Sequence, residues 1–274
     1  MLSKMLKNIK EKNPLIHCIT NYVTVNDCAN ILIACGASPI MADEKEEVEE
    51  ITSICNGLNI NIGTLNKNVI ESMILAGKKA NVLSHPVTFD PVGVGASNLR
   101  NSTAKRLLEE VKFAVIRGNI SEIKALALGS GRTKGVDANI SDVVTDENID
   151  GVISFAKDFS KKTKSIIAIS GAIDIVCNEN TAYVIRNGHK MMSKITGSGC
   201  MLTTLISAFV AANDDNYLEA TVAALCTMGI AGENAYEILK KNNSGNSSYR
   251  NYLIDEVYKL TEEDLEGGAK FEIK

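Results

Sequence analysis

The chain has 274 residues, of which 45% are hydrophobic and 23% charged, with a net charge of -4 at pH 7. This composition is typical of a globular enzyme and argues against a nucleic-acid partner, because nucleic-acid binding depends on basic patches. The seven cysteines are an odd number without a C-x-x-C pair, which favours reduced thiols in a cytoplasmic protein. No apolar run reaches the roughly 18 residues of a membrane span, so no membrane partner is expected.

From residue 26 to residue 170, longer helical patterns alternate with short apolar runs that are typical of strands. Helices are predicted at residues 26–35, 46–56, 66–83, 102–110 and 149–162. Strands are predicted at residues 38–42, 58–63, 86–90, 113–117 and 166–170. Such alternation is typical of βαβ units, whose parallel sheet is covered by helices on both faces. We therefore predict one α/β domain over residues 1–274, with three α/β/α layers around a mainly parallel central sheet.

The pattern changes after residue 170. The runs AIDIVC (172–177) and TAYVIR (181–186), separated by the turn-forming residues NEN, predict an antiparallel hairpin at a sheet edge. Two helices follow at residues 199–212 and 217–239, and the second is apolar on so much of its circumference that we expect it to be central. Residues 242–248 (NNSGNSS) are predicted to form a polar loop.

The stretch TGSGC (196–200) lies directly ahead of the first of these C-terminal helices. Glycines permit close approach of the backbone, and the first turn of a helix carries free N–H groups that attract phosphate. The stretch matches neither the P-loop nor the dinucleotide-binding pattern, and a tight turn alone would also explain its glycines. We interpret Gly197, Ser198 and Gly199 as candidate backbone donors to a phosphate group.

Cys200 would lie in the first turn of that helix, where the helix dipole favours the thiolate. Most free cysteines are simply small buried apolar residues. A covalent nucleophile would need a histidine partner, yet His17, His85 and His189 lie in three separate segments. A thiol with an ordinary pKa of about 8.5 is better matched to an alcohol than a carboxylate is. Cys200 is therefore a candidate general base for a hydroxyl that attacks a bound phosphate.

Two acidic residues follow strands of the predicted parallel sheet. Asp90 ends one strand, and Glu122 follows another in a segment that also contains Arg117. Parallel sheets bind their ligands at the carboxyl ends of the strands, and phosphoryl transfer requires Mg²⁺ to neutralise charge. Each acid alone could be a solvated loop charge or a helix cap. Together with an arginine suited to phosphate and the TGSGC stretch, they predict a phosphoryl-transfer site.

Seven stretches of the chain resemble the hydroxyethylthiazole kinase family, a member of the ribokinase-like superfamily. They are HCITNYVTVNDCAN (17–30), GASPIMA (36–42), NIGTL (61–65), FDPVGVGAS (89–97), IRGNISEI (116–123), KGVDA (134–138) and ITGSGCMLT (195–203). They cover the chain from about residue 14 to about residue 230 in the order of the family. Related ribokinase-like enzymes usually have an aspartate where this family, like this sequence, has the cysteine.

The resemblance implies transfer of the γ-phosphate of ATP to the hydroxyl of 4-methyl-5-(2-hydroxyethyl)thiazole, a step of thiamine salvage, with Mg²⁺ as cofactor. The roles that it implies are contact with the thiazole for Met41, Gly197 and Asn21, contact with ATP for Arg117, Ser170 and Asn119, and organisation of Mg²⁺ for Glu122 and Asp90. Ser170 stands where the family often has threonine, which keeps the hydroxyl. From the residues alone, Met41 could belong to the core, Ser170 could end a strand and Asn21 could cap a helix.

The resemblance also implies a homotrimer with its thiazole pockets at the subunit interfaces, which the apolar residues 31–37 permit. Three other functions stay open at this point. The chain could be a sibling kinase for hydroxymethylpyrimidine or a sugar, a non-catalytic thiazole or nucleotide sensor, or a thiol enzyme with Cys200 as its nucleophile.

Overall fold

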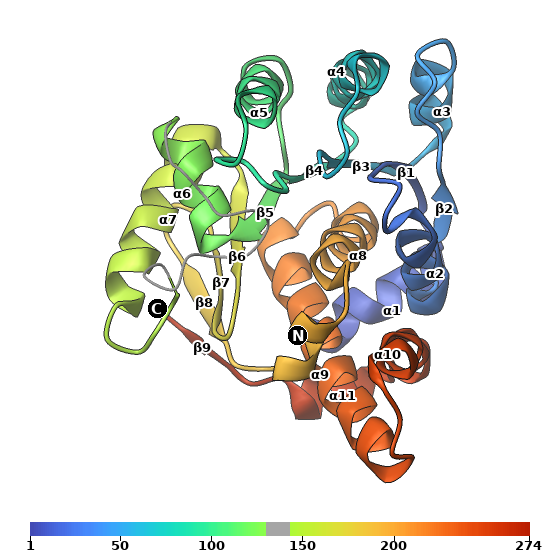
Figure 1. Ribbon diagram of the computed structural model, residues 1–274, viewed down its shortest axis with the longest axis vertical. Coiled ribbons are helices and arrows are strands. Elements are labelled where there is room, and N and C mark those ends of the chain that lie inside the picture. The colour runs from blue at the N-terminus through green and yellow to red at the C-terminus, as the bar shows by residue number, and fades with distance from the viewer. Residues whose placement is uncertain (130–142) are drawn as a thin grey trace.

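A mainly parallel sheet lies between two layers of helices in this computed structural model, which describes residues 1–129 and 143–274 (Figure 1). Within the described residues the sheet has nine strands in the order β2-β1-β3-β4-β5-β6-β7-β8-β9. The strands are β1 (Leu15–Ile19), β2 (Ser38–Ile40), β3 (Gly57–Asn61), β4 (Val87–Asp90), β5 (Val115–Asn119), β6 (Ile166–Ser170), β7 (Asp174–Cys177), β8 (Ala182–Ile185) and β9 (Phe271–Ile273). Neighbouring strands from β2 to β6 pair in parallel, and the pairs from β6 to β9 are antiparallel.

One face of the sheet is covered by helices that connect the parallel strands (Figure 1). They are α3 (Val48–Ile54), α4 (Lys67–Val82), α5 (Asn98–Glu110), α6 (Ile120–Leu128) and α7 (Ile149–Thr163). Their buried residues form one hydrophobic cluster with the side chains of that face, including Phe89 of β4, which stacks on Phe113. This layer matches the helices predicted from the sequence and adds α6.

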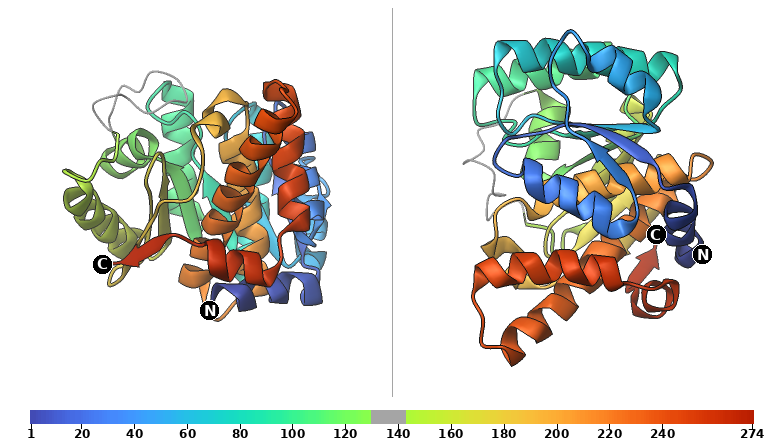
Figure 2. Two further views of the ribbon diagram at one scale, coloured as in Figure 1. Left: turned by 90° about the horizontal axis from the view of Figure 1, so that it is seen from below. Right: turned by 90° about the vertical axis from the view of Figure 1, so that its right-hand side faces the viewer.

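The other face carries the helices of the two chain ends together with α2. They are α1 (Leu2–Lys12), α2 (Val25–Cys35), α8 (Ser198–Ala212), α9 (Tyr217–Lys241), α10 (Asn246–Lys259) and α11 (Glu262–Gly268). Helix α9 lies against α1, α8, α10 and α11 as well as β6, β7 and β8, so it is surrounded on most sides (Figure 2). Its central position, predicted from its apolar circumference, is confirmed.

Two elements near the N-terminus were not predicted. Helix α1 is rich in lysine, but Leu2, Met5, Leu6 and Ile9 follow a helical spacing and all four are buried. Strand β1 contains His17, which is fully buried and uses both ring nitrogens in hydrogen bonds. The lysines of α1 and His17 of β1 interrupt the apolar patterns from which these two elements could have been predicted.

The C-terminal part adds structure that short-range patterns did not predict. The antiparallel hairpin of β7 and β8 is confirmed, and β9 pairs outside it, with Ile273 opposite Tyr183. The loop predicted at 242–248 is shorter, because Asn246 begins α10. The matching stretch KGVDA (134–138) lies outside the described residues.

Four adjacent parallel strands each end in a polar residue: β3 in Asn61, β4 in Asp90, β5 in Asn119 and β6 in Ser170. Parallel pairing sets Asn61 opposite Asp90, and Asn119 opposite Ser170. Because the strands run in the same direction, their polar ends gather at one edge of the sheet.

Candidate active site

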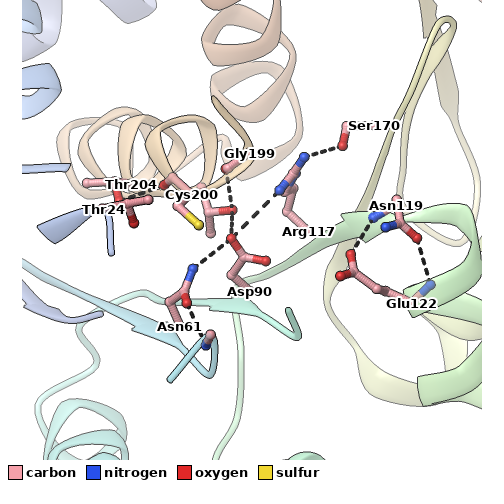
Figure 3. Close-up of polar contacts among 12 residues, drawn as sticks. Thr24, Asn61, Asp90, Arg117, Asn119, Glu122, Ser170, Gly199, Cys200 and Thr204 are labelled. Atoms are coloured by element: carbon pink, nitrogen blue, oxygen red, sulfur yellow. Dashed lines mark hydrogen bonds and ion pairs between the residues drawn. The ribbon is translucent and has the colours of Figure 1, made fainter. Parts of the chain in front are cut away.

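Asp90 lies at the centre of this edge and is fully buried (Figure 3). Its Oδ2 atom accepts hydrogen bonds from Asn61 Nδ2 at 3.0 Å and from Thr203 Oγ1 at 2.8 Å. Burial raises the pKa of Asp90 to about 6, and the nearby Arg117 charge opposes that shift. Its Oδ1 atom is buried and has no hydrogen-bond partner among the described residues. A carboxylate oxygen left in this way is available to a ligand.

Arg117 projects from β5 to the start of α8. Its Nη1 atom is 3.7 Å from Asp90 Oδ2, and its Nη2 atom donates a hydrogen bond to Ser170 Oγ. A Cβ atom on Gly199 would lie 2.5 Å from Arg117 Nη1, so the guanidinium rests directly against the first turn of α8. The structure thus brings together Arg117, Ser170 and the glycine-rich stretch.

Gly197 precedes the first turn of α8 with φ at 82°, a conformation that favours glycine. A Cβ atom there would lie 2.4 Å from Thr24 Cγ2, so this residue must also be small. The backbone N–H groups that follow, at Ser198, Gly199 and Cys200, belong to the first helical turn and have no acceptor within the helix. Beside a guanidinium they form an environment suited to an anion.

Cys200 is half-buried, whereas the other six cysteines, all within the described part of the chain, are buried. Its Sγ atom accepts a hydrogen bond from Asn21 Nδ2 at 3.3 Å. Burial raises the pKa of Cys200 to about 11, and the Asp90 charge acts in the same direction. The expected thiolate is therefore not favoured. The cysteine is a thiol near neutral pH because desolvation outweighs the attraction of the helix dipole.

Glu122 lies in the first turn of α6 and not in a loop. Its Oε2 atom accepts from the backbone N–H of Asn119 at 2.9 Å, and Asn119 Oδ1 accepts from the N–H of Glu122, which completes a capping box (Figure 3). Its Oε1 atom accepts from the N–H of Gly93 at 2.8 Å, in the loop after β4. Burial, followed by the charge of Asp90, raises the pKa of Glu122 to about 7. Glu122 thus joins the end of β5 to the loop after β4, at the edge that contains Asp90.

Met41 lies one residue beyond β2, is half-buried and packs against the cluster on the α2 and α8 side. Strands β1 and β3 separate β2 from β4, so the structure does not bring Met41 next to Asp90. His17 Nε2 lies 2.8 Å from the Ala42 carbonyl oxygen. Because a carbonyl oxygen only accepts, His17 takes the tautomer with a proton on Nε2 and donates it to Ala42. This contact fixes the backbone beside Met41.

Sequence reasoning missed Asn61, Thr203 and Arg100. Asn61 and Thr203 hold Asp90 Oδ2, and Arg100 donates to backbone carbonyls after β3 and β4. Asn61 lay inside the strand predicted at 58–63, which also contains Asn59, so its local sequence did not set it apart. The roles of Thr203 and Arg100 depend on contacts between distant segments, which no local pattern reports.

The three layers, helices on both faces of one sheet whose polar strand ends lie beside the start of α8, are those of the ribokinase-like fold. A ribokinase-like superfamily protein from Enterococcus faecalis V583 shares this fold with a TM-score of 0.61, at 12% identity over 95% of each chain. At that identity the likeness shows the fold alone.

The chain belongs to the hydroxyethylthiazole kinase family, whose model matches residues 6–263. It is 66% identical to a hydroxyethylthiazole kinase from Clostridium acetobutylicum over 99% of both chains. A hydroxyethylthiazole kinase structure from Pyrococcus horikoshii OT3 matches with a TM-score of 0.87 at 34% identity, over 100% of this chain and 98% of the other. The chain is therefore a kinase, which implies ATP as its co-substrate. Among the described residues, no helix is both long and apolar enough to cross a membrane.

Proposed function

We propose that this kinase transfers the γ-phosphate of ATP to the hydroxyl of 4-methyl-5-(2-hydroxyethyl)thiazole, giving the thiazole phosphate for thiamine salvage. One observation supports the chemistry above all others: the Arg117 guanidinium lies against the first turn of α8, beside the buried Asp90. Phosphoryl transfer depends mainly on positioning and on stabilising charge on the transferred oxygens, and this arrangement suits both.

In this proposal Arg117, Ser170 and Asn119 bind the triphosphate end of ATP. The backbone N–H groups of Gly197, Ser198, Gly199 and Cys200 face the transferred phosphoryl oxygens. Arg117 is only 11% exposed as a side chain, and its buried Nε atom has no hydrogen-bond partner among the residues that the structure describes. A phosphate oxygen is the acceptor that such a donor would take.

Asp90 and Glu122 are the residues proposed to hold Mg²⁺, which when bound neutralises charge on the phosphates. They fit this ion through water more readily than by direct contact. Glu122 already uses both oxygens on backbone N–H groups, although each oxygen can accept a second hydrogen bond. Asp90 Oδ1 has no hydrogen-bond partner in the described parts of the chain. The described residues hold no group of three or more His, Cys, Asp or Glu side chains that would bind a metal directly.

The thiazole alcohol is proposed to approach from the side of Gly197 and Asn21, with its hydroxyl beside Cys200. A thiol whose pKa is raised to about 11 already carries its proton at neutral pH and accepts a second one poorly. We therefore assign Cys200 to positioning the hydroxyl. The proton of the alcohol passes to an oxygen of the transferred phosphoryl group. A largely dissociative transfer needs little help from a separate base.

A homotrimer in the cytoplasm, with Met41 of one subunit reaching the thiazole pocket of the next, remains part of the proposal. Met41 is separated from Asp90 within one chain by two strands. Tyr22 and Val23, which follow Asn21, are 79% and 57% exposed, and Ile33 of α2 is 58% exposed. Exposed apolar side chains of this kind, two of which follow Asn21, are suited to an interface.

The test is ADP release by the purified protein with Mg-ATP, measured with and without hydroxyethylthiazole and, in parallel, with hydroxymethylpyrimidine. Turnover that depends on the thiazole alcohol is expected. Turnover with the pyrimidine alone would move the specificity to the sibling kinase. If the protein releases no ADP with either alcohol, the non-catalytic sensor is favoured.

A further inference from the structure

Asn61 ends β3 and is buried, with 1% of its surface exposed. A buried amide destabilises the fold unless its donors and its acceptor are hydrogen-bonded. The side-chain amide of Asn61 makes three hydrogen bonds to described residues. Its Nδ2 donates to Asp90 Oδ2 at 3.0 Å, and its Oδ1 accepts from Asn21 Nδ2 at 3.0 Å and from Gly63 N at 2.9 Å. All three partners belong to the strand ends and loops of the candidate site.

These partners determine the orientation of the Asn61 amide. A half-turn of the side chain would set its NH₂ group against two other N–H donors and its carbonyl oxygen against the Asp90 carboxylate. The observed orientation is therefore the one in which every polar atom of the amide finds a complementary partner.

The Asn21 amide extends the same network to the thiol. Its Nδ2 group also donates to Cys200 Sγ at 3.3 Å, and its Oδ1 accepts from the backbone N–H and hydroxyl of Thr24 at 3.2 and 3.1 Å. A continuous set of hydrogen bonds thus runs from Cys200 through Asn21 and Asn61 to Asp90. It links the start of α8 to the ends of β3 and β4.

We infer that Asn61 is a positioning residue for phosphoryl transfer, acting through Asp90 on one side and Asn21 on the other. Asn61 and Thr203 hold Asp90 Oδ2, so that Oδ1 is the oxygen left without a partner in the described part of the chain. The same amide fixes Asn21 against Cys200, where the alcohol is proposed to bind. The inference rests on the proposed function.

A positioning residue affects the geometry of the reacting groups more than it affects the binding of ATP. Most of the affinity for ATP would come from Arg117, Ser170 and the start of α8, none of which bonds to Asn61 among the contacts described above. A displacement of about 1 Å at a reacting centre can lower turnover by about 100-fold. Loss of Asn61 should therefore lower kcat and leave KM for ATP nearly unchanged.

The experiment is a double-mutant cycle with Asn61→Ala, Asn21→Ala and the double variant, assayed for kcat and KM with Mg-ATP and hydroxyethylthiazole. Asn61→Ala is expected to lower kcat by about 10- to 100-fold while KM for ATP changes by less than about threefold. Residues that act as one unit have non-additive effects, so the double variant should lose no more than the worse single variant.

Asn59→Ala is the matched control. Asn59 lies two residues earlier on the same face of β3 and is also fully buried, but its amide bonds to Thr204 at 2.9 Å and Thr88 at 3.2 Å, deeper in the core. This variant should lose thermal stability to a similar degree as Asn61→Ala, with kcat within about threefold of the unaltered protein. If Asn61→Ala does not fold, Asn61→Ser is the second variant, with the same expected loss of kcat.

Two results would overturn the inference while the proposed function stands: equal losses of kcat at Asn59 and Asn61, or losses at Asn21 and Asn61 that multiply. If the unaltered protein phosphorylates only the pyrimidine alcohol, the proposed substrate is wrong, and the same cycle on that alcohol decides the role of Asn61. If it phosphorylates no alcohol, both the proposed function and the inference fail.

Discussion

The sulfur of Cys200 faces the Asn21 amide in a half-buried space next to the Asp90 carboxylate. Desolvation disfavours the thiolate, and the neighbouring negative charge disfavours it further, so the pKa of Cys200 is raised to about 11. Glu122 differs, since its two oxygens accept hydrogen bonds from the backbone at the end of β5 and in the loop after β4. At the scale of single residues, the glutamate therefore contributes the shape of the acidic edge, whereas contact with the alcohol is the role proposed for the cysteine.

The raised pKa of Cys200 predicts how its alkylation depends on pH. The thiolate is the reactive form, so well below the pKa the rate of carboxamidomethylation should rise about tenfold per pH unit. We expect this rise to continue from pH 7 to pH 10 in the folded protein, followed as the labelled Cys200 peptide by mass spectrometry. Cys200→Ser identifies the peptide. A rate that levels off below pH 9 would contradict the burial argument.

Glu122→Gln should impair catalysis more than Cys200→Ser. The glutamine amide sets an NH₂ group against the N–H of either Gly93 or Asn119 and removes a charge from the proposed Mg²⁺ site. We expect a loss in kcat of about 100-fold or more for Glu122→Gln, and of less than about tenfold for Cys200→Ser, which keeps a small hydrogen-bonding group. Steady-state kinetics measure both. Equal losses would mean that the thiol takes part directly in the chemistry.

At the scale of elements, helix α5 holds the loops that flank the site. Arg100, in its first turn, donates from Nη1 to the carbonyls of Ile62 and Val92, both at 2.6 Å, and from Nη2 to the carbonyl of Gly63 at 2.7 Å. These carbonyls lie one or two residues after Asn61 and Asp90, at the ends of β3 and β4. A planar guanidinium serves three acceptors from two directions, which the single ammonium of lysine cannot reproduce.

Arg100→Lys is therefore predicted to destabilise the fold by about 1–3 kcal/mol, because carbonyls at a part-buried position lose charged hydrogen bonds. Arg106→Lys, one turn and a half further along α5, is the matched control. Its partners Glu71 and Glu110 are solvent-accessible carboxylates, so the expected loss of stability is smaller than for Arg100→Lys. Denaturant unfolding followed by circular dichroism measures both. A smaller loss at Arg100 than at Arg106 would contradict the proposed clamp.

At the scale of the whole molecule, the sequence predicted those parts of the fold that depend on local periodicity. Strand β6 begins and ends at the predicted residues, because an apolar run bounded by a helical pattern and a glycine leaves few alternatives. Strand β9 is short and exposed and pairs with β8, which lies far away in the sequence, so no local pattern could indicate it. Asp90 was predicted from its place at the end of a strand. Asn61 was not, because its role depends on the register of β3 with β4.

The central claim is that the strand ends and the start of α8 transfer a phosphoryl group to the thiazole alcohol. The most direct measurement incubates the protein with Mg-ATP carrying an isotopically labelled γ-phosphoryl group and with hydroxyethylthiazole, followed by mass spectrometry of all phosphorylated products. The account predicts that the label appears in a thiazole monophosphate in equal amount to the ADP formed. Label found only in free inorganic phosphate, released equally with and without the thiazole, would contradict it.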